Sequence, residues 1–179
     1  MPRSGIAASD SLVTNAPTRG VEAEIAVLLR ESLPPRDAAY TRVDVLAAIA
    51  SAHPAIEVLH SRFQDPDAVD PLSMLADSLA HLAFVHGAPV PDWQAVDLAA
   101  EEVVVLMDGA EVKRRTANPA GDMIRLLVWL ANEGSVWAGG LQAGQWITTG
   151  SWTGKDYAPP GAQVEMRFRS MGSVVVRFP

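Results

Sequence analysis

The sequence of 179 residues contains no cysteine, which excludes disulfide bonds, thiolate metal sites and a cysteine nucleophile. Basic residues are few. The 14 Lys and Arg against 21 Asp and Glu give a net charge of −7, without a basic block that could neutralise a nucleic-acid backbone. No apolar run reaches membrane-spanning length, and the N-terminus lacks the apolar core of a signal peptide. We therefore expect a cytoplasmic protein that binds neither nucleic acid nor a membrane.

The sequence does contain enough apolar residues to build a core. Hydrophobic residues make up 49% and charged residues 20%, which is the composition of a globular protein. Residues 1–19 mix Ser, Ala, Thr, Pro and Gly without periodicity, and we expect a flexible tail there. Residues 20–179 should then form a single domain.

Periodicity and turn signals predict an α+β, β-rich fold with two main helices. Strands are expected over about 20–29, 55–63, 82–87, 99–107, 110–115, 145–149, 163–169 and 174–178. Asp108-Gly109 should form a hairpin turn between two of them. Helices are expected from the capping box of Thr41 and Asp44 to about Ala52, where Pro54 follows, over 72–80, and from Asn118-Pro119 to Gly134.

The stretch Val21-Glu22-Ala23-Glu24-Ile25-Ala26 alternates acidic and apolar residues, as a half-buried strand does. Glu22 and Glu24 then share one face, where repulsion across about 6–7 Å amounts to roughly 2–3 kcal/mol at an effective dielectric near 20. A cation, a basic partner or solvation must offset that repulsion. The pair is interpreted either as a solvated edge strand or as two hard oxygen ligands for a divalent ion.

A second glutamate-bearing strand, Ile56-Glu57-Val58-Leu59-His60-Ser61-Arg62, follows further along the chain. With the Glu22–Glu24 strand it resembles the metal-binding strands of the 2-keto-4-pentenoate hydratase branch of the fumarylacetoacetate hydrolase superfamily. Further stretches follow in the family's order: Ala76-Asp77-Ser78, Asn118-Pro119 through Trp129-Leu130-Ala131-Asn132, Leu141-Gln142-Ala143-Gly144, Thr149-Gly150-Ser151 and the closing Gly172-Ser173-Val174-Val175-Val176-Arg177-Phe178.

The resemblance implies a roll of mixed sheets in which Glu22, Glu24 and Glu57 hold Mg²⁺ or Mn²⁺. It also implies a hydratase that acts on small 2-hydroxy-dienoic or 2-oxo acids, as in aromatic-compound catabolism. Decarboxylation or C–C hydrolysis would use the same chelation of the substrate by the metal ion. The alternative is a non-catalytic or auxiliary relative that needs a partner chain. A homo-oligomer is expected in either case.

The proton carrier that such chemistry needs is not obvious in the sequence. Asp77 and His60 are the candidates, although strand alternation points His60 away from Glu57. A helix-end or turn role is the alternative for Asp77. The remaining histidines, His53, His81 and His86, are scattered and show no ligand spacing.

Four residues are candidates for binding the substrate: Arg62, Ser78, Ser151 and Thr153. Arg62 shares the strand parity of Glu57 and could pair with a carboxylate, with an ordinary ion pair as the alternative. Ser78 could border the site or stabilise a turn. Ser151 and Thr153 follow a glycine turn, where their hydroxyls could bind a carboxylate or stabilise the turn itself.

Two features depart from the family pattern. Family members have a sizeable region before the Glu-x-Glu strand, including a lysine-bearing segment that helps line the active site, whereas only residues 1–19 stand there in this sequence. His60 and Ser78 occupy positions where Asp and Asn are usual. These departures predict a shortened relative with an open acidic cleft, or a site completed by another chain.

Overall fold

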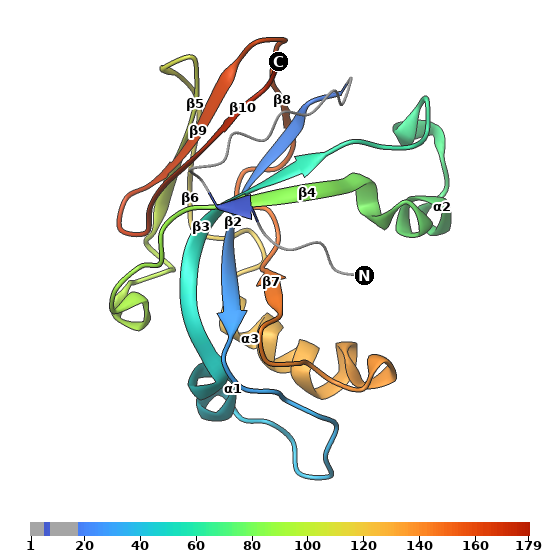
Figure 1. The fold of residues 1–179 in the computed structure, drawn as a ribbon, viewed down its shortest axis with the longest axis vertical. Helices are drawn as coiled ribbons and strands as arrows, with labels where there is room; N and C mark the ends of the chain where they lie inside the picture. Colours follow the sequence, from blue (N-terminus) through green and yellow to red (C-terminus); the bar gives the residue numbers. More distant parts are fainter. Residues whose placement is uncertain (1–5, 8–17) are drawn as a thin grey trace.

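The computed structural model describes residues 6–7 and 18–179, which form two sheets and a group of short helices (Figure 1). The larger sheet has the order β1-β4-β3-β2-β7, with β8 also paired to β2, and its strands are β1 (Ile6–Ala7), β2 (Gly20–Leu29), β3 (Ile49–Leu59), β4 (His81–His86), β7 (Trp146–Thr148) and β8 (Asp156–Tyr157). The smaller sheet has the order β10-β9-β5-β6, from β5 (Glu102–Met107), β6 (Ala110–Thr116), β9 (Gln163–Phe168) and β10 (Gly172–Arg177).

The core lies between the two sheets. Strand β2 alternates as predicted, so that Val21, Ala23 and Ile25 are fully buried on one face. Strands β9 and β10 of the smaller sheet pack against β3. They contribute apolar side chains to the same cluster, among them Val164, Met166, Val174 and Val176. The expected β-rich α+β fold is confirmed.

Strand β3 corrects the sequence analysis at Pro54. The helix expected to reach Ala52 ends at Ala48, and β3 runs from Ile49 straight through Pro54. The Pro54 carbonyl accepts a hydrogen bond from the Gly87 N–H at 2.8 Å, beyond the last residue of β4. The missing proline N–H therefore faces the end of β4, where the sheet loses no ladder hydrogen bond.

The hairpin between β5 and β6 is confirmed. Asp108 (φ +51°) and Gly109 (φ +82°) both adopt the left-handed conformation, as a tight turn between two twisted strands requires. Asp108 also ties the hairpin to β9, because its carboxylate accepts from the Gln163 N–H at 2.9 Å.

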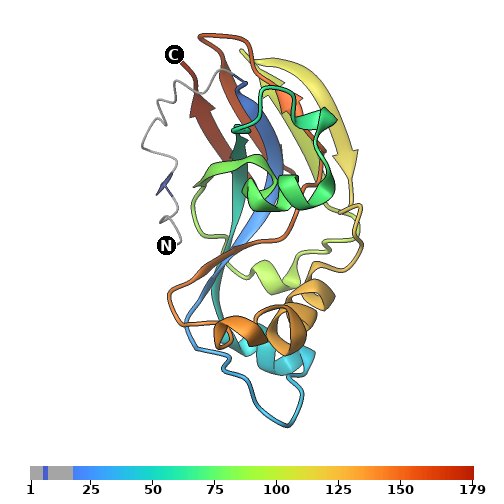
Figure 2. The same cartoon turned by 90° about the vertical axis from the view of Figure 1, so that its right-hand side faces the viewer.

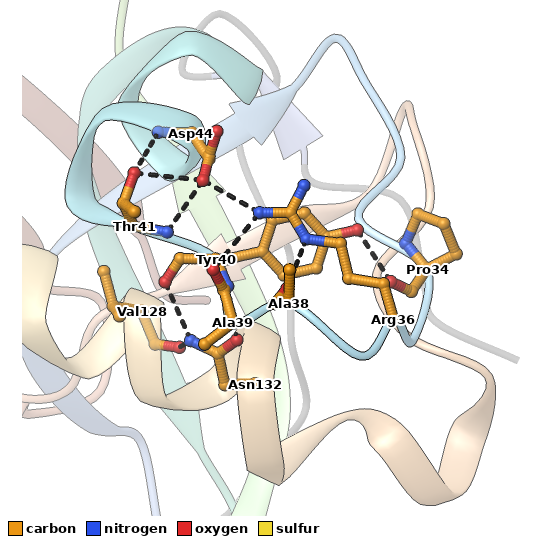
Figure 3. Close-up of polar contacts among 9 residues, drawn as sticks. All are labelled: Pro34, Arg36, Ala38, Ala39, Tyr40, Thr41, Asp44, Val128 and Asn132. Atoms are coloured by element: carbon orange, nitrogen blue, oxygen red, sulfur yellow. Dashed lines mark hydrogen bonds and ion pairs between the residues drawn. The ribbon is translucent and has the colours of Figure 1, made fainter.

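Helix α1 (Arg42–Ala48) begins at the predicted capping box. The Thr41 hydroxyl accepts from the Asp44 N–H at 3.2 Å, and the Asp44 carboxylate accepts from the Thr41 N–H at 2.8 Å (Figure 3). Asn132, in the helical segment that follows α3, contacts the residue before the α1 cap. Its side chain accepts from the Tyr40 N–H and donates to the Tyr40 carbonyl (Figure 3). The two segments lie together below the sheets (Figure 2).

Helix α3 (Met123–Trp129) starts later than predicted. The Asn118 side chain accepts from the Ala120 N–H at 2.8 Å and closes a turn, and Asp122 caps the helix instead. The helix continues into a π-turn, η4 (Leu130–Gly134). The other helical segments are α2 (Pro71–Ala76), η1 (Pro66–Ala68), η2 (Ser78–Ala80), η3 (Trp93–Ala95) and η5 (Val136–Ala138).

In the described part of the chain, no helix is long and apolar enough to cross a membrane. Most of the predicted tail over 1–19 lies outside the described residues. Within it, Ile6–Ala7 pairs in parallel with β4. The predicted division into a tail and one domain stays a prediction.

Candidate metal centre

The structure brings Glu22, Glu24 and Glu57 together on the face of the larger sheet that points away from the core. Glu22 and Glu57 are direct cross-strand partners of β2 and β3, and Glu24 lies two residues along β2 on the same face. One carboxylate oxygen from each residue lies within 4.8 Å of the others. This cluster is called the acidic triad below.

The acidic triad crowds like charges at a buried position. Glu24 is only 2% exposed. Burial, followed by the charge of Glu57 and a hydrogen bond with it, raises the pKa of Glu24 to about 8, although the Gly150 N–H and Thr148 counteract this. Burial and the charge of Glu57 also raise the pKa of Glu22, against the opposing effects of Ser151 and Lys155.

Residues 149–154, the edge segment, run beside β2 and hold the triad's strand in place. The Thr149 N–H and hydroxyl both donate to the Ile25 carbonyl, at 3.1 and 2.8 Å. The Trp152 N–H donates to the Ala23 carbonyl at 2.8 Å. Between these contacts, the Gly150 N–H donates to Glu24 Oε2 at 3.1 Å. The edge segment therefore orients one carboxylate of the triad directly.

The hydroxyls of Ser151 and Thr153 bond to backbone groups of the edge segment and of β2. Thr153 Oγ1 accepts from the Ala23 N–H at 3.1 Å and donates to the Gly154 carbonyl at 3.0 Å. Ser151 Oγ accepts from the Gly154 N–H at 2.9 Å. Ser151 also hydrogen-bonds Glu22, so it lies at the triad. A substrate-binding role for Ser151 and Thr153 stays a prediction.

His81 is a neighbour of the triad that the sequence analysis missed. Its Nδ1 lies 2.6 Å from Glu57 Oε1. It opens β4, which is paired with β3 across a register shift at Val58 and Leu59. Spacing along the chain gives no signal for such a contact, because β-sheet pairing alone creates it. An imidazole in this position fixes the orientation of a ligating carboxylate.

Asp77 and Arg62 form a separate cluster at the start of β4. Asp77 is buried and accepts hydrogen bonds from the Ser61 hydroxyl at 2.8 Å and from Arg62 Nη1 at 3.2 Å. Burial alone would raise the pKa of Asp77, but the bonds from Ser61 and Arg62 outweigh it and lower that pKa. Arg62 also donates to the His81 carbonyl at 3.1 Å.

This cluster corrects the parity argument for Arg62. Strand β3 ends at Leu59, so Arg62 lies in a loop rather than on the strand that carries Glu57. His60 follows that strand end, and its Nδ1 contacts Thr18 Oγ1 at 3.0 Å. Ser78 is exposed in a left-handed turn at φ +55°. The predicted catalytic and substrate-binding roles of these residues stay predictions.

The donor set of the triad fits a hard divalent cation. All three donors are carboxylates, as Mg²⁺ and Mn²⁺ favour. Within residues 18–179, no lysine or arginine forms an ion pair with Glu22 or Glu24. The fold therefore buries Glu24 beside two like charges without a basic partner, and a bound cation would remove that repulsion.

Comparisons with known proteins find relatives, although no model of a protein family matches the chain. Over 160 residues, 88% of the chain, it is 31% identical to a 4-oxalocrotonate decarboxylase from Pseudomonas putida, of which it spans 59%. It is 32% identical to a 2-keto-4-pentenoate hydratase from Burkholderia vietnamiensis over 73% of the chain and 49% of the relative. The chain thus spans about half to three fifths of these relatives' length.

Comparison of the fold with solved structures finds the same kind of relative. The structure of 4-oxalocrotonate decarboxylase from Pseudomonas putida G7, complexed with magnesium and adipate, matches 97% of this chain and 64% of that chain, with a TM-score of 0.78 and 28% identity. The sequence and fold comparisons thus point to the same group of relatives. The chain belongs to the fumarylacetoacetate hydrolase superfamily, in the branch that contains the 2-keto-4-pentenoate hydratases.

Proposed function

We propose that the acidic triad binds one divalent cation, Mg²⁺ or Mn²⁺, and that the loaded site acts on small 2-hydroxy-dienoic or 2-oxo acids. The convergence of three carboxylates within 4.8 Å carries this proposal. The raised pKa of Glu24 supports it, because a buried carboxyl beside two others is a destabilising arrangement that a cation relieves. The magnesium complex of the related decarboxylase supports the choice of ion.

The bound cation would supply a Lewis acid for the substrate's carboxylate and 2-oxygen. The chain's own residues hold the ligands in place. Glu22 and Glu57 face each other across β2 and β3, the Gly150 N–H orients Glu24, and His81 Nδ1 orients Glu57. Preorganised ligands lose little freedom on binding, which favours catalysis by orientation.

The geometry argues against Asp77 as the general acid. Both of its oxygens are engaged by Ser61 and Arg62, and these contacts lower its pKa, so it stays ionised near neutral pH. A general acid needs a pKa near the operating pH. His60 stays a candidate for proton transfer.

Hydration is the first candidate reaction, in which water adds to the far end of the conjugated chain. Decarboxylation is the second, and the names of the decarboxylase relatives favour it. Both reactions would develop negative charge on the oxygen held at the metal, so one site suits either. The non-catalytic alternative predicts cation binding without turnover.

Calorimetric titration with Mn²⁺ tests the metal site. We expect Glu24→Gln to weaken Mn²⁺ binding at least about 100-fold, because a charged ligand is replaced by a neutral amide of the same shape. Glu31→Gln is the matched control, since Glu31 is exposed just beyond the end of the same strand. Wild-type affinity in Glu24→Gln would overturn the proposed site.

Two assays on the Mn²⁺-loaded protein then separate the reactions. Loss of the conjugated absorbance of 2-hydroxypenta-2,4-dienoate reports hydration, and release of CO₂ from 4-oxalocrotonate reports decarboxylation. Turnover in neither assay, with Mn²⁺ bound, would support the non-catalytic alternative. Light scattering on the same samples tests the proposed homo-oligomer.

A further inference from the structure

Four aromatic side chains gather on the same sheet face as the acidic triad. Trp146 of β7 stacks on His86 of β4, with ring centroids 4.3 Å apart and planes inclined by 24°. Phe84 lies edge-on to Trp146 at 5.7 Å, and His53 of β3 lies edge-on to it at 4.8 Å. We call Phe84, His86 and Trp146 the aromatic wall. His53 supports it from β3.

The register places Phe84 of the aromatic wall directly beside the triad, whereas Trp146 pairs with Leu28, four residues along β2 from Glu24. Phe84 is the cross-strand partner of Glu57. His86 is the partner of Ala55, which is in turn the partner of Glu24. Cross-strand partners on one face have Cβ atoms about 5 Å apart, so the wall begins one residue from the carboxylates.

Two small residues between the triad and the far end of the sheet face are covered by the aromatic rings. Ala26 and Ala55 are fully buried under the aromatic rings, where Phe84 and Trp146 pack on them. A longer side chain at either alanine would displace the rings of Phe84 and Trp146 that pack on it. Trp146 and His86 themselves are only half-buried. The face thus presents the carboxylates of the triad together with the partly exposed rings of His86 and Trp146.

Hydrogen bonds fix the imidazoles of the wall. His53 Nδ1 and His86 Nδ1 lie 2.8 and 3.1 Å from the same Gly87 carbonyl, which can only accept, so both nitrogens donate. Ser51 Oγ lies 2.8 Å from His53 Nε2 and donates to it. Gly87 allows this arrangement, because a Cβ there would lie 2.6 Å from the Ser173 carbonyl oxygen. The orientations of these two imidazoles are therefore set by the backbone and by Ser51.

We propose that the aromatic wall receives the carbon chain of the substrate and makes the site selective for flat, conjugated acids over saturated ones. This inference rests on the proposed function, because the triad and its cation would hold the acid head of the same molecule. A planar conjugated chain offers its π-face to the His86–Trp146 stack, whereas a saturated chain has no π-face and loses conformational freedom when it is held extended. Phe84, His86 and Trp146 are thus specificity-determining residues.

Three ligands of the Mn²⁺-loaded protein test the inference by calorimetry. Oxalate reports binding of the acid head alone. Trans,trans-muconate and adipate are dicarboxylates of equal length and charge, and only the first is conjugated and flat. We expect the wild type to prefer muconate. Trp146→Leu and His86→Leu should each weaken muconate binding about tenfold and leave oxalate binding within about twofold.

Two control variants test whether the loss of muconate binding comes from the loss of the aromatic ring. Trp146→Phe retains an aromatic ring and should retain most of the preference for muconate. Trp137→Leu removes a tryptophan that is 88% exposed and should change neither ligand. An unchanged muconate-to-adipate ratio in Trp146→Leu and His86→Leu would overturn the inference, as would a parallel loss of oxalate. Failure of the wild type to bind Mn²⁺ or oxalate would instead refute the proposed function on which the inference rests.

Discussion

Glu24 and Asp77 are both buried carboxylates, at 2% and 6% exposure, yet their surroundings have opposite effects. Asp77 receives hydrogen bonds from Ser61 and Arg62, and its pKa is lowered. Glu24 has one backbone donor, Gly150, and two other carboxylates beside it, and its pKa is raised to about 8.

The difference separates a structural acid from a candidate functional one. The donors around Asp77 are supplied by the chain itself, so its corner is satisfied without any ligand. The charge crowding around Glu24 is relieved only by a proton or by a cation that enters from outside. Unfavourable charge crowding at a buried position, not the mere presence of acids, therefore marks the candidate metal site.

The largest expected effect is on the structural side of the comparison. Asp77→Ala should lower the melting temperature by about 10 °C, because it leaves the Ser61 hydroxyl without its acceptor and the Arg62 guanidinium without its counterion. Differential scanning calorimetry measures the shift. Asp67→Ala, at an exposed nearby position, is the control and should stay within about 2 °C. An equally small shift in Asp77→Ala would remove the distinction between the two acids.

The next substitution, Glu24→Gln, should stabilise the folded protein, whereas Asp77→Ala destabilises it. In chelator-treated protein, the folded-state pKa of Glu24 lies above its unfolded value, so the folded state binds more protons between pH 4.5 and about 8. Stability should therefore be full below pH 4.5 and fall as the pH rises towards 8. At pH 7, Glu24→Gln should be more stable than the wild type by about 3 kcal/mol.

Urea unfolding of both proteins at pH 5 and pH 7 tests this prediction. The advantage of Glu24→Gln should grow with pH and should shrink once Mn²⁺ is added, since the cation stabilises only the wild type. An advantage that is the same at both pH values would show that charge crowding is not its cause.

A smaller effect should follow from the support given to Glu57. His81→Leu should weaken Mn²⁺ binding about tenfold, because Glu57 loses the donor that orients it at 2.6 Å. His81→Gln retains a donor and should recover part of the affinity. Equal affinities in His81→Leu and wild type would show that Glu57 is oriented without this histidine.

The local features of the site could be predicted from the sequence. Alternation around Glu22 and Glu24 placed both on one strand face, and the capping box at Thr41 and the turn at Asp108 were found from local rules. Each of these features depends on residues within one turn or one strand, where sequence periodicity is informative.

The aromatic wall and His81 could not be predicted, because they depend on pairing between strands. Helical spacing before Pro54 suggested a helix over the segment that forms the first half of β3, so His53 was not placed on the face of Glu57. The register shift between β3 and β4 decides that His81 reaches Glu57. A single sequence without an alignment carries little information about such long-range register.

The central claim is that the acidic triad is one metal site, and anomalous diffraction tests it most directly. Crystals grown with Mn²⁺ and oxalate should show one anomalous peak between the carboxylates of Glu22, Glu24 and Glu57, with oxalate density beside it. A triad without the peak, or with a lysine or arginine side chain between the three carboxylates, would contradict the account.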